Sequence, residues 1–220
     1  MNRVLIIGAS GGIGSALVDR FAAQGADVDR LSRSVDGFDV TDAASVAQHL
    51  AGRGPYDRVV VATGALEIAG ASPEKTIKGL DAKAMADQFA LNAIGPALVL
   101  SHAHSLLPRD RPSVLAVLSA RVGSIGDNLY GGWISYRSAK AAVNQITHTA
   151  AIELARTHKQ AAVIALHPGT VATPFTAKYL DRHPAVPATE AADNLIAVMS
   201  ALTPGQTGKF FDYSGAEVVW

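Results

Sequence analysis

A glycine-rich turn directly after a short apolar run constrains the fold of this chain more than any other feature. The run Val4–Ile7 is continuously apolar, and the residues GASGGIG follow it at 8–14. An apolar run this short that ends in glycines is typical of a parallel strand buried on both faces. A helix is predicted from about Gly12 to Gln24, with Gly25 as the candidate cap at its C-terminal end. The chain therefore opens with the strand–turn–helix unit from which parallel α/β sheets are built.

The rest of the chain continues this alternation of short strands and longer helices. Further strands are predicted at Ala26–Leu31, Phe38–Val40, Arg58–Ala62, Val114–Leu118, Ala162–His167 and Lys209–Asp212. Further helices are predicted from Thr41 or Asp42 to about Ala51, over Asp81–Leu107 with an irregularity at Gly95-Pro96, over Tyr136–Arg156 and over Thr189–Leu202. Such alternation favours an open parallel sheet, and the right-handed crossover rule makes it doubly wound. We therefore predict an α/β, Rossmann-like fold in a single domain over residues 1–220, with about seven strands and helices on both faces.

Composition excludes several classes of function. The 220 residues suit one large domain and include no cysteine, which excludes disulfides, cysteine-ligated zinc, iron–sulfur clusters and a thiol nucleophile. The 19 lysines and arginines balance the 19 aspartates and glutamates without a basic stripe, so no nucleic-acid partner is expected. The N-terminus lacks a signal-peptide pattern, and no stretch approaches the ~20 apolar residues that span a bilayer. We predict a soluble cytoplasmic protein with no membrane partner. No metal site is predicted either, because His102 and His104 are two residues apart on a helix and face different ways.

The glycine-rich turn has the composition of a phosphate-binding loop. Glycines permit a tight turn and a close backbone approach to a pyrophosphate, which then lies on the N-terminus of the following helix. The spacing is G-x-x-x-G-x-G, which differs from the usual G-x-G-x-x-G dinucleotide pattern. Such turns also occur as plain connections between a strand and a helix. The position between the first strand and the first helix favours dinucleotide binding.

A tyrosine and a lysine are four residues apart in Tyr136-Arg137-Ser138-Ala139-Lys140, so they share one face of a helix. A phenol has a pKa near ~10, and a nearby ammonium lowers that pKa. Such a tyrosine can exchange a proton with a carbonyl or alcohol oxygen while a cofactor transfers hydride. Taken alone, this common spacing favours an ordinary surface pair on an alanine-rich helix.

Together these residues resemble the short-chain dehydrogenase/reductase family, and the resemblance extends over essentially the whole chain. The segment ARVGSIGDNLYGGWISYRSAKAAVNQ and the C-terminal FFDYSGAEVVW are similar to the branch that contains C-factor-like proteins and small carbonyl reductases. The signature residues occur in the family's order: GASGGIG at 8–14, Asp39-Val40, Asn92, the Ser119 region, Tyr136 with Lys140, and Pro168-Gly169 with Thr173.

The resemblance assigns a role to each of these positions. It implies that Tyr136 is the acid/base, that Lys140 holds the nicotinamide ribose and lowers the Tyr136 pKa, and that Asn92 holds a water. The implied cofactor-binding residues are Gly8, Ser10, Gly11, Gly12, Ile13 and Gly14 at the phosphates and ribose, Asp39 and Val40 at the adenine, Thr63, Gly64 and Lys140, and Pro168, Gly169, Val171 and Thr173 at the carboxamide. Several of these residues could instead have purely structural roles: Asn92 as a polar residue inside a helix, Asp39 as a turn residue, and Pro168-Gly169 as a plain turn.

The chain departs from the family pattern at the catalytic serine. The run Ser119-Ala120-Arg121-Val122-Gly123 places Ala120 where the family has the serine that binds the substrate oxygen. Neighbouring strand residues point to opposite faces, so Ser119 is one residue too early. Either the strand end twists to present Ser119, or Ser124 substitutes, or the contact is missing; we select Ser119. The loss of one such donor typically costs ~10²–10³ in rate.

Other positions near the expected site have several readings. Val61-Ala62-Thr63-Gly64 replaces the family's Asn-Asn-Ala-Gly, and Thr63 is expected to replace part of the lost amide bracing. Tyr130 and Trp133 are candidates for the substrate wall, and Trp133 alternatively packs in a subunit interface. His167 is interpreted as structural. The resemblance makes residues 175–187 the substrate lid.

The choice of cofactor depends on the end of the second strand, Leu31-Ser32-Arg33-Ser34. A hydroxyl followed by a guanidinium suits a 2′-phosphate, which favours NADP(H) over NAD. Asp29 is the competing candidate for the adenosine 2′-hydroxyl, but it lies three residues earlier. Arg33 alternatively is a simple surface arginine.

The sequence therefore predicts an NADP(H)-dependent oxidoreductase that interconverts a small-molecule carbonyl and an alcohol, with Tyr136 as acid/base. The resemblance implies a homodimer or homotetramer assembled through helices near 88–107 and 136–155. A dinucleotide-binding regulatory or signalling protein with weak or vestigial catalysis is the alternative, for which Ala120 and the resemblance to C-factor-like proteins are the reasons. A methyltransferase that binds S-adenosylmethionine also uses a glycine-rich first turn, but it gives no reason for Tyr136 and Lys140.

Overall fold

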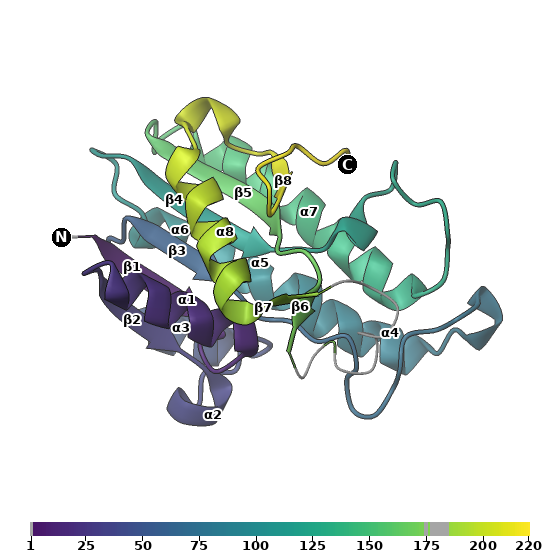
Figure 1. Cartoon of the computed structure of the whole chain (residues 1–220). Helices are drawn as coiled ribbons and strands as arrows, with labels where there is room; N and C mark the ends of the chain where they lie inside the picture. Colours follow the sequence, from purple (N-terminus) through teal and green to yellow (C-terminus); the bar gives the residue numbers. More distant parts are fainter. Residues whose placement is uncertain (1, 174–175, 177–184) are drawn as a thin grey trace.

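The chain forms a parallel sheet of six strands in the order β2-β1-β3-β4-β5-β8 (Figure 1). The computed structural model describes residues 2–173, 176 and 185–220. The strands are β1 (Arg3–Ile7), β2 (Asp27–Leu31), β3 (Arg58–Val61), β4 (Ser113–Leu118), β5 (Ala161–His167) and β8 (Phe210–Asp212). A second, two-stranded parallel sheet pairs β6 (Val171–Ala172) with β7 (Val186–Pro187). The order of the main sheet reverses at β1, which places the switch point between the carboxyl ends of β1 and β3.

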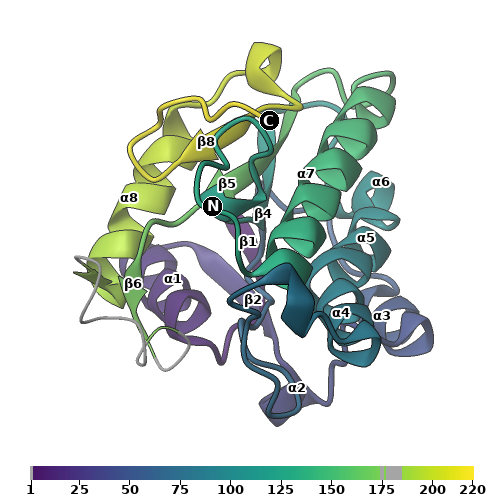
Figure 2. The same ribbon diagram turned by 90° about the vertical axis from the view of Figure 1, so that its right-hand side faces the viewer.

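Helices cover both faces of the main sheet (Figure 2). One face carries α1 (Gly12–Ala23) and α8 (Ala188–Ala201), and the other carries α3 (Ala43–Leu50), α5 (Gly95–Leu100), α6 (Ala103–Leu106) and α7 (Ile134–Leu154). The remaining helical segments are α2 (Arg33–Asp36), α4 (Ala82–Phe89), a π-helical stretch at Ala90–Ile94, and 3₁₀ turns at Ile77–Gly79, Arg121–Gly123 and Pro204–Gln206. The predicted doubly wound α/β fold is confirmed.

The core is divided by the alternation of side chains along the strands. In β1, Val4 and Ile6 pack with the residues of α1 and α8, whereas Leu5 and Ile7 pack with those of α3, α5 and α7. All four side chains have no exposed surface. Burial on both faces explains why the parallel strands read as continuous apolar runs.

The predicted strand at Phe38–Val40 is wrong. These residues form a turn that leads into α3, and Asp39 is the reason: its Oδ1 accepts hydrogen bonds from the backbone nitrogen and the hydroxyl of Thr41, at 2.9 and 2.7 Å. Asp42 then caps α3 by accepting from the Ala44 nitrogen. Phe38 and Val40 are buried in the core without joining the sheet. The main sheet therefore has six strands where about seven were predicted.

The long helical region after residue 81 is irregular, as predicted, but the irregularity begins earlier. A π-helical stretch covers Ala90–Ile94, and Gly95 and Pro96 already belong to the first turn of α5. Proline has no N–H, so Pro96 cannot donate the α-helical hydrogen bond to the carbonyl of Asn92. The helix widens immediately before the proline, where that bond is lost.

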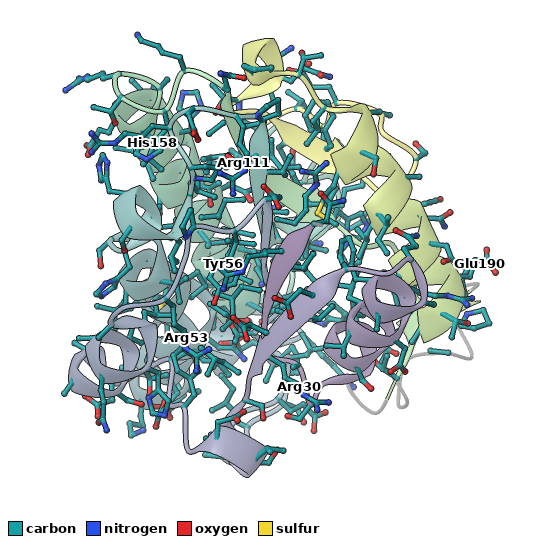
Figure 3. All side chains as sticks on the ribbon, turned by 90° about the vertical axis from the view of Figure 1, so that its left-hand side faces the viewer. Arg30, Arg53, Tyr56, Arg111, His158 and Glu190 are labelled. Atoms are coloured by element: carbon teal, nitrogen blue, oxygen red, sulfur yellow. The ribbon has the colours of Figure 1, made fainter. Side chains whose placement is uncertain are left out.

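Charged side chains hold together the amino-terminal end of the sheet. Figure 3 looks onto this end and labels Arg53, Tyr56 and Arg111. The Tyr56 hydroxyl donates to Asp29 at 2.5 Å, and Arg3 and Arg53 lie 3.6 and 3.9 Å from the same carboxylate. The competing role of Asp29 as a cofactor ligand is therefore wrong, because these contacts engage its carboxylate.

Two further findings concern the described residues. Among them, no helix combines the length and the apolar character that crossing a bilayer requires. No three acidic or histidine side chains of this part of the chain gather as metal ligands would.

Replacing Gly14 with alanine tests how closely α1 packs against the glycine-rich turn. A Cβ at Gly14 would lie 2.1 Å from the carbonyl oxygen of Gly8, so the backbone has to move. We expect the free energy of unfolding to fall by about 1–3 kcal/mol, although alanine favours helix more than glycine does. Urea unfolding followed by tryptophan fluorescence measures this change.

The matched control for this variant is Gly79→Ala, because no atom lies within 4 Å of a Cβ at that position. We expect it to change the stability by less than about 0.5 kcal/mol. Equal unfolding midpoints for the two variants would contradict the packing argument.

Candidate active site

A cavity of about 370 Å³ lies at the carboxyl ends of the central strands. The glycine-rich turn after β1, the ends of β3, β4 and β5, and one face of α7 contribute to its walls. It is lined by Ser10, Gly11, Gly12, Ile13, Ala62, Thr63, Gly64, Leu118, Ser119, Ala120, Tyr136, Lys140, His167, Pro168, Gly169, Val171, Thr173 and Thr176. The fold thus brings together most of the residues that the sequence nominated. Of the predicted set, Gly8, Gly14, Arg33, Asp39, Val40 and Asn92 do not line it.

The glycine-rich turn presents unpaired backbone donors to this cavity. Gly8 has a φ of +89°, which glycine adopts without strain, and its nitrogen donates to the Leu31 carbonyl at the end of β2. The first hydrogen bond inside α1 runs from the Ser15 nitrogen to the Gly11 carbonyl. The N–H groups of residues 12–14 therefore have no acceptor within the helix. No side chain caps this end, so the turn and the helix dipole favour an anion there.

The opposite wall comes close to the start of α1. A Cβ at Gly12 would lie 2.5 Å from Cγ2 of Thr173, so the threonine side chain would have to move to admit one. Pro168, Gly169 and Val171 lie on the same wall, after β5. Tyr213 packs against Gly169, because a Cβ there would lie 2.9 Å from its ring.

Tyr136 and Lys140 are both buried on the sheet-facing side of α7, with exposures of 6% and 3%. The Lys140 ammonium lies 5.8 Å from the centre of the Tyr136 ring and donates to the Leu118 carbonyl at 3.0 Å. Burial lowers the pKa of Lys140 to about 8, because desolvation disfavours the charged amine. Burial also raises the pKa of Tyr136 above the usual value of a phenol.

The expected lowering of the Tyr136 pKa is not seen as a net effect in this structure, because burial shifts that pKa upward. Desolvation disfavours the phenolate, and the ammonium faces the Leu118 carbonyl and the ring. At neutral pH the phenol keeps its proton.

Asn92 lies outside the cavity lining and braces the loop that follows β3. Its amide nitrogen donates to the Ala65 carbonyl at 2.9 Å and to Oε1 of Gln88 at 2.7 Å. Its Oδ1 accepts from the Ala65 nitrogen, and Gln88 in turn donates to the Leu66 carbonyl. A Cβ at Gly64 would lie 2.7 Å from Asn92 Oδ1 and 3.5 Å from Lys140 Nζ. Asn92 and Lys140 thus approach the same glycine.

The two candidate serines and Ala120 lie at different positions relative to the cavity. Ser119 lines the cavity, but its hydroxyl donates to Oδ1 of Asn144 on α7 at 2.5 Å. Ala120 lines the cavity with a methyl group. Ser124 does not line the cavity, and its hydroxyl accepts from the Asp127 nitrogen at 3.1 Å.

The residues predicted to bind the adenosine end lie beside the turn after β2. Arg33 is exposed in α2 and is close enough to Asp39 to contribute to the lowered pKa of that carboxylate, whose main cause is the hydrogen bond from Thr41. The Ser32 hydroxyl donates to Asp36 at 3.0 Å. Val40 is buried, and its methyl groups lie against Gly95, since a Cβ there would come within 2.9 Å of them.

Thr63 does not take over the bracing of the lost asparagine, contrary to expectation. Its Oγ1 is buried and has no hydrogen-bond partner among the described residues. Because Thr63 and Gly64 both line the cavity, this oxygen fits a polar ligand better than a structural role.

Sequence reasoning missed several residues around the site. His167, interpreted as structural, lines the cavity. Its position at the end of a strand, directly before Pro168-Gly169, could have indicated that it lies at the site. Glu74 was also missed, and no feature of the sequence pointed to it. Its carboxylate accepts hydrogen bonds from the hydroxyl and the backbone nitrogen of Ser135, which is 61 residues away at the start of α7.

The predicted substrate wall differs from the observed one. Neither Tyr130 nor Trp133 lines the cavity; Tyr130 is 92% exposed, and Trp133 packs edge-on against the Tyr136 ring. The predicted lid, residues 175–187, lies mostly outside the described residues.

Comparisons with known proteins identify the family. A family model described as short chain dehydrogenase matches residues 37–183, which is more than half of the chain and includes Tyr136 and Lys140. A 1-hydroxy-2-glutathionyl-2-methyl-3-butene dehydrogenase from Rhodococcus is 31% identical over 232 residues, covering 100% of each protein. The C-signal protein of Myxococcus xanthus is 34% identical over 139 residues, covering 62% of this chain and 78% of that protein.

Solved structures with similar folds cover the whole chain. A short-chain dehydrogenase/reductase from Burkholderia multivorans with bound NADP has a TM-score of 0.80 and 25% identity, covering 100% of this chain and 99% of that one. An NADPH-bound carbonyl reductase from chicken fatty liver has a TM-score of 0.82 and 23% identity, with the same coverage, and supports the fold. From the family match, the relatives and the fold together, this chain belongs to the short-chain dehydrogenase family of oxidoreductases.

Proposed function

We propose that this protein reduces a small-molecule carbonyl to an alcohol with NADPH, and that Tyr136 donates the proton. One observation carries this proposal: a buried, protonated phenol and a buried ammonium lie together in a cavity that also exposes the N-terminus of α1. A phosphate-binding helix start and a proton donor are the two parts that this reaction needs.

The cavity fits a dinucleotide. The unpaired N–H groups at the start of α1 suit a pyrophosphate, and the orphaned Thr63 Oγ1 offers a further polar contact. The glycines lining this end leave room for a close backbone approach. When bound, NADPH supplies the hydride. Arg33 supports the phosphorylated cofactor because an exposed guanidinium beside the turn after β2 suits a 2′-phosphate. The Burkholderia relative with bound NADP is consistent with this choice.

The electrostatics of the pair support the reducing direction. Burial raises the pKa of Tyr136, so the phenol holds a proton that it can give to the developing alkoxide. The ammonium of Lys140, held by the Leu118 carbonyl, then stabilises the phenolate that remains.

The remaining predictions about partners and location belong to this proposal. The substrate is a small molecule, in keeping with a cavity of about 370 Å³. A homodimer or homotetramer through the helices near 88–107 and 136–155, and a cytoplasmic location, stay predictions.

Ala120 favours a second candidate function. A methyl group occupies the position expected for the substrate-binding serine. The similarity to the C-signal protein of Myxococcus, whose name refers to signalling, also supports a regulatory role. The second candidate is a dinucleotide-binding regulatory protein with weak catalysis. Binding of NADPH without turnover of any carbonyl would favour it.

Tyr136→Phe tests the proton donor. The ring is retained, so we expect NADPH to bind as before, while carbonyl reduction falls by about 10²–10⁴-fold because the proton donor is lost. Absorbance of NADPH measures turnover over a carbonyl panel, and quenching of tryptophan fluorescence measures binding. If the variant turned over as fast as the wild-type protein, Tyr136 would not be the donor.

Arg33→Ala tests the cofactor preference. A charge-assisted hydrogen bond contributes about 1.5–3 kcal/mol, so NADPH affinity should fall roughly 10- to 100-fold, while NADH affinity stays the same. Arg30→Ala is the matched control, because Arg30 is also an exposed arginine of this region (Figure 3). Fluorescence titration with both cofactors measures the result. Equal loss for NADPH and NADH would contradict the assignment.

The pH profile tests the role of the ammonium. The pKa of Lys140 is lowered to about 8, so the side chain is a cation below that pH and neutral above it. We expect kcat/KM for reduction to be level below pH 8 and to fall as the pH rises through about 8, while the raised pKa of Tyr136 keeps the phenol protonated. Lys140→Met should give a low, level profile. A wild-type profile that stays level up to pH ~10, the ordinary pKa of a phenol, would contradict this role.

A further inference from the structure

None of the three described positions considered for the substrate-binding hydroxyl, 119, 120 and 124, offers an unengaged hydroxyl to the cavity. Ala120 brings a methyl group, the Ser119 hydroxyl donates to Asn144, and the Ser124 hydroxyl caps a turn outside the cavity lining. A carbonyl oxygen that gains charge during reduction is stabilised by more than one hydrogen-bond donor. A second donor to this oxygen would then come from another side chain of the cavity.

His167 is in the right place to supply this donor. It is the last residue of β5, and β5 pairs with β4 so that Leu166 lies opposite Leu118, immediately before Ser119 and Ala120. Side chains alternate along a strand, so His167 points to the same side as Val163, which packs in the part of the core beneath α7. Tyr136 reaches the cavity from α7, and both side chains line it. Figure 2 shows α7 beside this edge of the sheet.

The imidazole of His167 has an unused nitrogen. Its Nδ1 is buried without a hydrogen-bond partner among the described residues. A buried polar atom left unpaired costs about 1–3 kcal/mol and calls for a partner, and a molecule bound in the cavity is one such partner.

The imidazole is also in the right protonation state. Burial lowers the pKa of His167 to about 4, with Arg121 and Lys140 acting in the same direction and Asp212 of the paired β8 opposing them. The ring is therefore neutral at neutral pH and carries one N–H. A neutral imidazole can donate a hydrogen bond without adding a second proton source beside Tyr136.

We propose that the neutral imidazole of His167 donates a hydrogen bond to the substrate carbonyl oxygen, in place of a hydroxyl at position 120. This inference rests on the proposed function. In the reduction, the new O–H bond forms with the proton of Tyr136, and the C=O π electrons become the oxygen lone pair that takes it. His167 keeps its own proton throughout. With His167 in this role, the site provides two donors to the carbonyl oxygen although position 120 is alanine.

Four variants test this proposal against a structural role. His167→Phe keeps a ring but removes both nitrogens, and His167→Asn keeps an N–H donor. Ala120→Ser restores a hydroxyl, alone and combined with His167→Phe. We expect His167→Phe to lower kcat/KM by about 10²–10³-fold and to leave the NADPH dissociation constant within about twofold. The Asn variant should retain at least a tenth of the wild-type kcat/KM, and Ala120→Ser should raise the kcat/KM of the Phe variant at least tenfold.

Rescue by a serine separates the two roles, because a new hydroxyl at position 120 cannot repair a packing defect at position 167. The proposal is overturned if His167→Phe keeps its kcat/KM within twofold of wild type. It is also overturned if neither the Asn variant nor the added serine recovers activity while NADPH binding is intact.

A second measurement does not depend on turnover. The ¹⁵N resonances of the His167 ring are assigned by their loss in His167→Phe. They should shift when a panel carbonyl compound is added to wild-type protein saturated with NADP⁺, which cannot deliver hydride. No shift with any compound would overturn the role of His167. If the resonances shift but the wild-type protein turns over no carbonyl, or Tyr136→Phe is fully active, the proposed function fails and the binding role of His167 stands.

Discussion

The burial of one ammonium group organises the site. Lys140 is 3% exposed, and its ammonium donates to the Leu118 carbonyl, which ties the middle of α7 to the end of β4. A charge in such a place is costly unless it is hydrogen-bonded, so its surroundings are tightly constrained. Gly64 and Gly123 lie against the side chain and the backbone of this lysine, where a Cβ would come within 3.5 and 2.7 Å. The position of Tyr136, one helical turn earlier, follows from this attachment.

The alternation of buried strands with helices was enough to predict the architecture, because parallel strands buried on both faces leave an unambiguous apolar pattern. Residues Phe38–Val40 are an exception. Two apolar residues around an aspartate have the pattern of a strand, but the Asp39 carboxylate accepts hydrogen bonds from Thr41, and the chain turns there. The glycine-rich turn, Tyr136 and Lys140 were nominated through the family resemblance, because the spacing of Tyr136 and Lys140 alone favoured an ordinary surface pair. The pKa of Tyr136 was not predictable, because it depends on burial by elements distant in sequence.

Long-range polar contacts account for the other features that sequence reasoning missed. Glu74 reaches Ser135 across 61 residues, and Gln88 reaches Leu66 across 22. Together with Asn92 they attach the irregular chain between β3 and α4 to the helices beside the cavity. Nothing in the local sequence of a loop predicts its distant hydrogen-bond partners. The hydrogen bond that Ser119 donates to Asn144, across 25 residues of the sequence, is of the same kind.

The acidic side chains Asp29 and Asp57 hold the amino-terminal end of the sheet through Tyr56, Arg3 and Arg111. The cavity lies at the opposite, carboxyl-terminal end. The length of the strands thus separates these polar contacts from the cavity. Side chains around the cavity, such as the one at position 120, can therefore be replaced without disturbing these ion pairs. A scaffold arranged in this way can acquire new substrates by a few replacements at one end.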